Sequence, residues 1–108
     1  MRLRRPFRDV IGRQLELFVH GHAGLLEQIA DARRAYDDAG REDAEQRFAE
    51  YQAWASDATD ALIQMRDAFA ATLDDVRADE YAAEFNRAVR RRFADLALEL
   101  EEQTFEDL

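Results

Sequence analysis

The first third of the chain carries a row of residues at helical spacing, apolar except for one histidine. Between positions 11 and 36 the steps alternate between four and three residues, which places the whole row on one line of an α-helix. The row consists of Ile11, Leu15, Phe18, His22, Leu25, Ile29, Ala32 and Tyr36. This spacing is typical of helices that pack lengthwise against one another. The sequence therefore predicts a long helix that other helices cover.

Residues that interrupt helices are rare along the rest of the chain. Its 108 residues include one proline, at position 6, and only four glycines. A chain with so few breakers favours an all-α fold. At this length a single domain is expected, a helical bundle over residues 1–108 with flexible ends at 1–5 and 103–108.

The glycines and aspartates predict where the helices end. Gly40 suits the position that follows a helix, so a first helix over about 6–38 and a second over about 41–73 form a long antiparallel hairpin. A shorter third helix is predicted over about 79–102. A tight turn is expected near 73–78, where Asp74, Asp75 and Asp79 are candidate N-caps. The alternative is that the second and third helices are continuous.

The second predicted helix has the most regular period. Its predicted inward row is Ala44, Phe48, Tyr51, Ala55, Ala58, Leu62, Met65 and Phe69, and Trp54, Ala61 and Ala68 form another row at sevenfold spacing. In an antiparallel hairpin, Gly21 and Gly24 of the first helix would face the small residues in the middle of the second. We therefore expect these glycines to permit close packing of the two helices.

Composition argues against several classes of function. The chain has no cysteine, which excludes disulfides and thiolate metal sites and fits the cytoplasm. Its formal charge of −9 disfavours nucleic-acid binding. No apolar stretch approaches the ~20 residues that span a bilayer, and no secretory signal is recognisable, so we expect a soluble protein.

The two ends of the sequence carry opposite charge. Residues 1–13 contain five arginines and one aspartate, whereas residues 95–108 contain six acidic residues and no basic one. One interpretation is a basic N-terminal arm that binds a partner. The other is that the two ends neutralise each other, within one chain or between two chains.

Glu16, His20 and His22 are the weak candidates for a metal site. Residues two apart on a helix point ~200° away from each other, so one face cannot use both histidines. Glu16 and His20 share a face, but it lies opposite the predicted packing row. Arg13 and His20 have the loose spacing of the arginine and histidine of HEPN ribonucleases, whose usual polar residue after the arginine is replaced here by Gln14.

The chain is also similar in length and acidity to the helical-hairpin substrates of type VII secretion. The predicted turn carries Gly40, but it lacks the tryptophan that those proteins place there, since Trp54 lies inside the second helix. This resemblance implies a secreted helical hairpin, and it rests on size and shape.

The sequence favours a non-catalytic protein that acts through protein–protein association, as a homodimer or as an accessory module, with no cofactor, nucleic acid or membrane. The third helix is too short to cover the hairpin, so apolar surface remains for a second copy. The predicted interface residues are Val10, Ile11, Leu15, Leu17, Phe18, His22, Leu25 and Trp54. The alternatives are a metal-binding or hydrolytic bundle that uses the His20/His22 region, and the type VII substrate.

Overall fold

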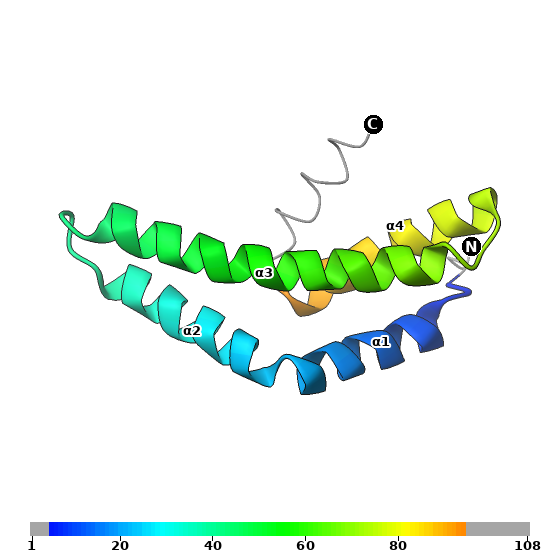
Figure 1. Cartoon of the computed structure of the whole chain (residues 1–108), viewed down its shortest axis with the longest axis horizontal. Coiled ribbons are helices and arrows are strands. Elements are labelled where there is room, and N and C mark those ends of the chain that lie inside the picture. The colour runs from blue at the N-terminus through cyan, green and yellow to red at the C-terminus, as the bar shows by residue number, and fades with distance from the viewer. Residues whose placement is uncertain (1–4, 95–108) are drawn as a thin grey trace.

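The computed structural model describes residues 5–94, and in this part of the chain four α-helices follow one another (Figure 1). They are α1 (Arg8–Gly21), α2 (Ala23–Asp38), α3 (Ala44–Ala70) and α4 (Asp75–Arg92). The expected all-α class is confirmed. The expected number of three helices is wrong, because the first predicted helix is divided in two.

The division falls at His22, inside the range 6–38 that the sequence predicts as one helix. His22 has φ −125° and ψ 29°, outside the helical region. The backbone ladder nevertheless continues on both sides, since the His22 N–H donates to the Phe18 carbonyl over 2.9 Å and the His22 carbonyl accepts from Leu26 over 3.0 Å. Only one residue is therefore non-helical, and the chain bends there.

The bend allows the two halves to follow different partners. α1 packs against α4, whereas α2 packs against α3. Figure 1 shows α4 behind the second half of α3, whereas α2 runs along the first half of α3, so α1 and α2 have different neighbours. Gly21 and His22, both poor helix formers, place the bend at this point of the sequence.

The other boundaries are close to the predicted ones. The second predicted helix, 41–73, is observed as α3 over 44–70, and the third begins at Asp75, not at 79. Separate helices are thus observed, and the continuous alternative is wrong. Of the three candidate caps, Asp74 is the one that functions: its carboxylate accepts a 2.9 Å hydrogen bond from the Arg77 N–H. α4 ends at Arg92, and Phe93 leaves the helical region with φ −129° and ψ 68°, so the prediction of one helix through 102 is wrong. Residues 95–102 and the tails 1–4 and 103–108 lie outside the described residues.

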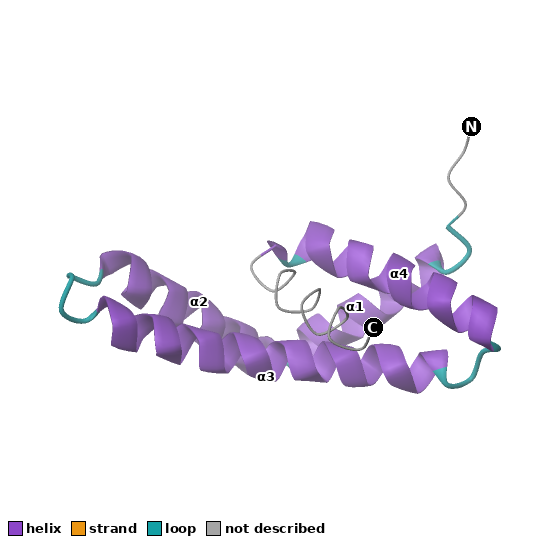
Figure 2. Cartoon of the chain, turned by 90° about the horizontal axis from the view of Figure 1, so that it is seen from above, coloured by secondary structure: helices purple, strands orange, loops and turns teal. Residues whose placement is uncertain are grey.

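The described part of the molecule has a thick half and a thin half. Figures 1 and 2 together place α1, the second half of α3 and α4 side by side, whereas the remaining half contains α2 and the beginning of α3. We call the thin half the arm, comprising α2 and residues 44–58 of α3. The arm accounts for the elongated shape, with principal extents of 49 × 30 × 29 Å over the whole chain.

Most of the core lies in the thick half, where aromatic rings meet edge to face. Phe7 contacts Phe69 and Tyr81 with ring centroids 6.5 and 5.4 Å apart, and Phe18 contacts Phe93 at 5.7 Å. The buried apolar residues are Phe7, Ile11, Leu15, Phe18, Ile29, Tyr51, Ala55, Ala58, Leu62, Tyr81, Phe85 and Val89. Such ring pairs add to the free energy that area burial alone contributes.

The glycines do not have the expected role. Gly21 and Gly24 are exposed, and a Cβ built on either would meet no other atom within 4 Å. Close packing of α2 on α3 therefore does not require them. Each glycine directly precedes a residue of the first row, His22 or Leu25, so helical rotation places it about 100° away from that row.

Candidate association surface

Three of the predicted interface residues belong to the core of the chain itself. Ile11, Leu15 and Phe18 are 2%, 3% and 0% exposed, so they are unavailable to a partner of this structure. Val10, His22 and Leu25 are half-buried. Leu17 and Trp54 are the two that remain open, at 67% and 38% exposure.

Four further apolar residues, Val10, Leu17, Val19 and Leu26, flank the first row. Val10, Val19 and Leu26 are in fact partly buried against the core, so packing within the chain accounts for them. Leu17 alone of this group stays exposed, on the outer side of α1 among Arg13, Glu16 and other polar neighbours. A single exposed leucine is ordinary for a protein surface.

The arm is much less well buried than the thick half. α2 contains one buried residue, Ile29, along its 16 residues. The outer end of the arm is held by an aromatic cluster in which Phe48 lies 5.3 Å from Tyr36 and 6.4 Å from Tyr51. Phe48, which the sequence places inside, is 41% exposed. Two helices that bury this little apolar surface are weakly stabilised by their mutual packing.

α3 packs against both α2 and α4, and one of its sides stays open. Its buried residues, from Tyr51 to Arg66, lie on the side that these helices cover. Trp54, Ala61 and Ala68 repeat every seven residues and therefore share one line of the helix. Trp54 and Ala68 are exposed and Ala61 is half-buried, so this line runs along the edge of the covered side. We call these three residues the α3 stripe.

Phe48 and Trp54 flank the buried Tyr51 on α3 and lie about 120° apart round the helix. Phe48 and Trp54 are each three residues from buried Tyr51, and each step of three rotates the helix by about 60° in the same direction. The α3 stripe contains Trp54 and not Phe48. These two residues have almost equal exposure, which makes Phe48 a matched reference for Trp54.

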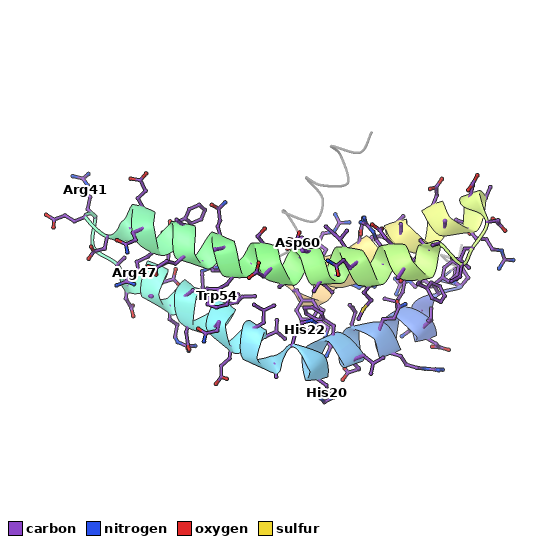
Figure 3. All side chains as sticks on the ribbon, in the orientation of Figure 1. His20, His22, Arg41, Arg47, Trp54 and Asp60 are labelled. Atoms are coloured by element: carbon purple, nitrogen blue, oxygen red, sulfur yellow. The ribbon has the colours of Figure 1, made fainter. Side chains whose placement is uncertain are left out.

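The histidines point in opposite directions, as their spacing predicts. Figure 3 shows His20 directed away from α3 and His22 in the space between the bend and α3. His20 Nε2 lies 3.8 Å from Glu16 on the exposed side. The His22 ring stacks on Phe18 with the ring centroids 4.7 Å apart. Its Nδ1 lies 3.1 Å from the Phe18 carbonyl oxygen, which accepts a hydrogen bond when Nδ1 carries a hydrogen. Within residues 5–94, no three potential ligands come together that could hold a metal ion.

A polar contact connects α1 to the core of α4. The Tyr81 hydroxyl donates a 2.7 Å hydrogen bond to Gln14 Oε1, while the tyrosine ring is fully buried. Burial raises the pKa of Tyr81 from 10.0 to about 12, because the phenolate is poorly solvated there. A second contact, from Arg66 to Asn86 Oδ1 at 3.1 Å, connects α3 to α4.

Sequence reasoning missed a charged groove between α1 and α4. Glu84 is 5% exposed and lines two adjoining cavities of about 280 and 800 Å³. Arg5, Arg8 and Arg91 surround the smaller cavity, and Arg87 borders the larger one. The available signal was the spacing of Tyr81, Glu84, Ala88 and Arg91, which places the glutamate on the side of α4 that faces α1.

Comparison with known proteins gives no relative of this chain: no protein-family model, curated protein or solved structure matches it. Among the four described helices, none combines the length and the hydropathy of a segment that crosses a membrane.

Proposed function

We propose that this chain is a non-catalytic association module that forms a homodimer through the open side of α3. The proposal rests on the position of Trp54, an exposed tryptophan on α3. It lies in the arm, where α2 has only one buried residue along its length. Tryptophan is among the residues most enriched at the energetic centres of interfaces. The absence of cysteine fits a reducing compartment such as the cytoplasm.

The α3 stripe has a form that suits antiparallel pairing of two copies. In a symmetric dimer the same surface serves both partners, so Trp54 of one copy meets Ala61 of the other, and the reverse contact follows from the symmetry. A large side chain opposite a small one allows two helices to approach closely. At 27 residues α3 is about 40 Å long, which offers a long line of contact.

Charge does not oppose this pairing, although it would oppose other arrangements. Residues 23–58 carry nine acidic side chains and four arginines, so two arms that met face to face would repel each other. Next to the α3 stripe lie Arg47, Glu50 and Asp57, which together leave one negative charge, whereas exposed Asp60 and Asp67 lie farther round the helix. The α3 stripe is therefore a less acidic surface for a second copy than the face of the arm.

The test compares Trp54→Ala with Phe48→Ala by sedimentation equilibrium over a range of concentrations. We expect the full chain to dimerise and Trp54→Ala to raise the dissociation constant about 30-fold, the loss of ~2 kcal/mol that is typical of an interface hot spot. Phe48→Ala removes an aromatic ring of similar exposure from outside the α3 stripe, so its dissociation constant should change by less than about threefold.

Two results would contradict the proposal. A full chain that stays at the mass of one copy, 12.5 kDa, up to high concentration excludes the dimer. A dimer that Phe48→Ala weakens as much as Trp54→Ala excludes the α3 stripe as its centre. Circular dichroism of both variants provides the control that the helices remain folded.

A further inference from the structure

The groove between α1 and α4 has an excess of basic groups, which is greatest around its smaller cavity, where Arg5, Arg8 and Arg91 meet one carboxylate, Glu84. We call Arg5, Arg8, Arg87 and Arg91, together with the Glu84 between them, the basic groove. Within residues 5–94, none of these four arginines forms an ion pair with a carboxylate. The larger cavity is also lined by Arg77, Asp74 and Glu80, so the two cavities together have five arginines and three carboxylates and keep a net positive charge, in a chain whose formal charge is −9.

The groove also has an apolar floor and room for an occupant. Ile11 and Leu15 line its smaller cavity, which measures about 280 Å³, and both belong to the core. Gly12 also lines this cavity, and its missing side chain leaves open space. A segment that combined acidic side chains with apolar ones would therefore match both the rim and the floor.

We propose that residues 95–108 of the same chain dock in the basic groove. This segment contains six acidic residues and no basic one, and leucine and phenylalanine are interspersed among them. Its charge complements the groove, and its apolar residues complement the floor. The proposal is independent of the dimer, because the basic groove and the α3 stripe involve different helices.

The distance from the end of α4 allows docking within one chain. Arg91 and Arg87 precede Ala94 by three and seven residues, which is about 5 and 10 Å along the helix. A segment of 14 residues reaches back over this distance even as a helix, which would be about 20 Å long. A tethered segment acts at a high effective concentration, so moderate attraction is enough to hold it.

Disulfide trapping tests this placement, because the natural sequence contains no cysteine. Gly12→Cys introduces one thiol in the groove, and Ala97→Cys or Gln103→Cys introduces the other while keeping every acidic residue. Gly24→Cys is the matched control: this glycine is also exposed and also has open space for a Cβ, but it lies on α2. The readout is the rate of disulfide formation in the dilute full chain, followed by mass and by non-reducing electrophoresis.

Gly12→Cys is combined with either Ala97→Cys or Gln103→Cys. We expect at least one of these two double variants to form a disulfide within one chain at least tenfold faster than the matching variant that carries Gly24→Cys. Reversing the groove with Arg8→Glu and Arg91→Glu, both exposed positions, should reduce that rate to the level of the control. The same change of charge at exposed Arg34 and Arg41, on α2 and in the following turn, should leave the rate unchanged. High salt should slow the trapping, because the attraction is electrostatic.

Equal rates at Gly12 and Gly24 would overturn the proposal, and so would disulfides that form only between two chains. A fast rate that survived both the charge reversal and high salt would also overturn it, because the arginines would then have no part in the contact. Loss of the dimer in a Trp54→Ala variant would leave the trapping result unaffected, so the failure of one proposal can be told from the failure of the other.

Discussion

At the scale of single residues, Tyr81 is the described side chain whose pKa is most clearly changed by its burial. It is fully buried, touches Phe7 and Phe69, and holds Gln14 of α1 with its hydroxyl. A buried phenol that donates a hydrogen bond is stable, whereas the phenolate would lose both solvation and its role as donor. The junction of α1 and α4 therefore depends on the neutral form of this residue.

Tyr81 should make the protein sensitive to high pH. Its pKa is raised from 10.0 to about 12 in the folded chain, so the unfolded chain releases this proton first. The stabilising contribution is complete below pH 10 and is lost as the pH rises from 10 to about 12. Urea unfolding at several pH values in this window, compared between the natural chain and Tyr81→Phe, measures the effect. A natural chain with no steeper loss of stability than Tyr81→Phe would contradict this account.

Gly24 is a place where the protein can be stabilised. The residue is exposed, its φ is not positive, and a methyl group there meets no other atom. Gly24→Ala should stabilise the fold by up to about 1 kcal/mol, because alanine loses less backbone entropy than glycine in a helix. Thermal unfolding of the variant checks this. A loss of stability would mean that α2 and α3 do need the glycine for close packing.

The burial of some individual residues can be predicted from the sequence, and that of others cannot. The four–three spacing correctly placed Ile11, Leu15, Phe18, Tyr51 and Leu62 in the core, because helical rotation alone decides which side they occupy.

Phe48 and Glu84 could not be placed in the same way. Phe48 shares the period of the inward residues, but α4 does not extend far enough to cover it. Glu84 is buried because α1 crosses above it, and its own identity predicts exposure. Both outcomes depend on how far neighbouring helices reach, which local spacing does not specify.

At the scale of elements, the bend at His22 is the main difference from the sequence prediction. The spacing of the first row continues unbroken through His22, so periodicity alone predicts one helix. The two halves have different neighbours, since α1 packs against α4 and α2 against α3, and the bend falls at the weak helix formers Gly21 and His22. The weak helix formers indicate where a bend would fall, but the sequence does not indicate that the helix bends.

The start of α4 offers a direct test at this scale. The Asp74 carboxylate satisfies the Arg77 N–H, one of the otherwise unpaired donors at the beginning of a helix. Asp74→Ala should destabilise the protein by about 1 kcal/mol. Asp79→Ala removes the same charge from inside α4, where the side chain has no capping bond, and should change stability much less. Chemical denaturation of the two variants makes the comparison, and equal losses would contradict the role of Asp74 as the cap.

At the scale of the whole molecule, the unequal lengths of the helices define both proposed surfaces. α4 covers part of α3 and meets α1, which leaves the open side of α3 and creates the basic groove between α1 and α4. The sequence anticipated this imbalance in outline, since the predicted third helix was the shortest. It could not indicate which side of α3 would remain open, because that depends on the crossing of α1 and α4.

We propose that Trp54 lies at the interface of a dimer, and the fluorescence of Trp54 is the most direct test of this position. Trp54 is the single tryptophan of the chain, so its emission reports on this one position. Dimerisation through the α3 stripe predicts that the emission shifts to shorter wavelength, and that quenching by iodide falls, over the same concentrations at which the sedimentation mass doubles. A doubled mass without any change in the emission or quenching of Trp54 would contradict the claim.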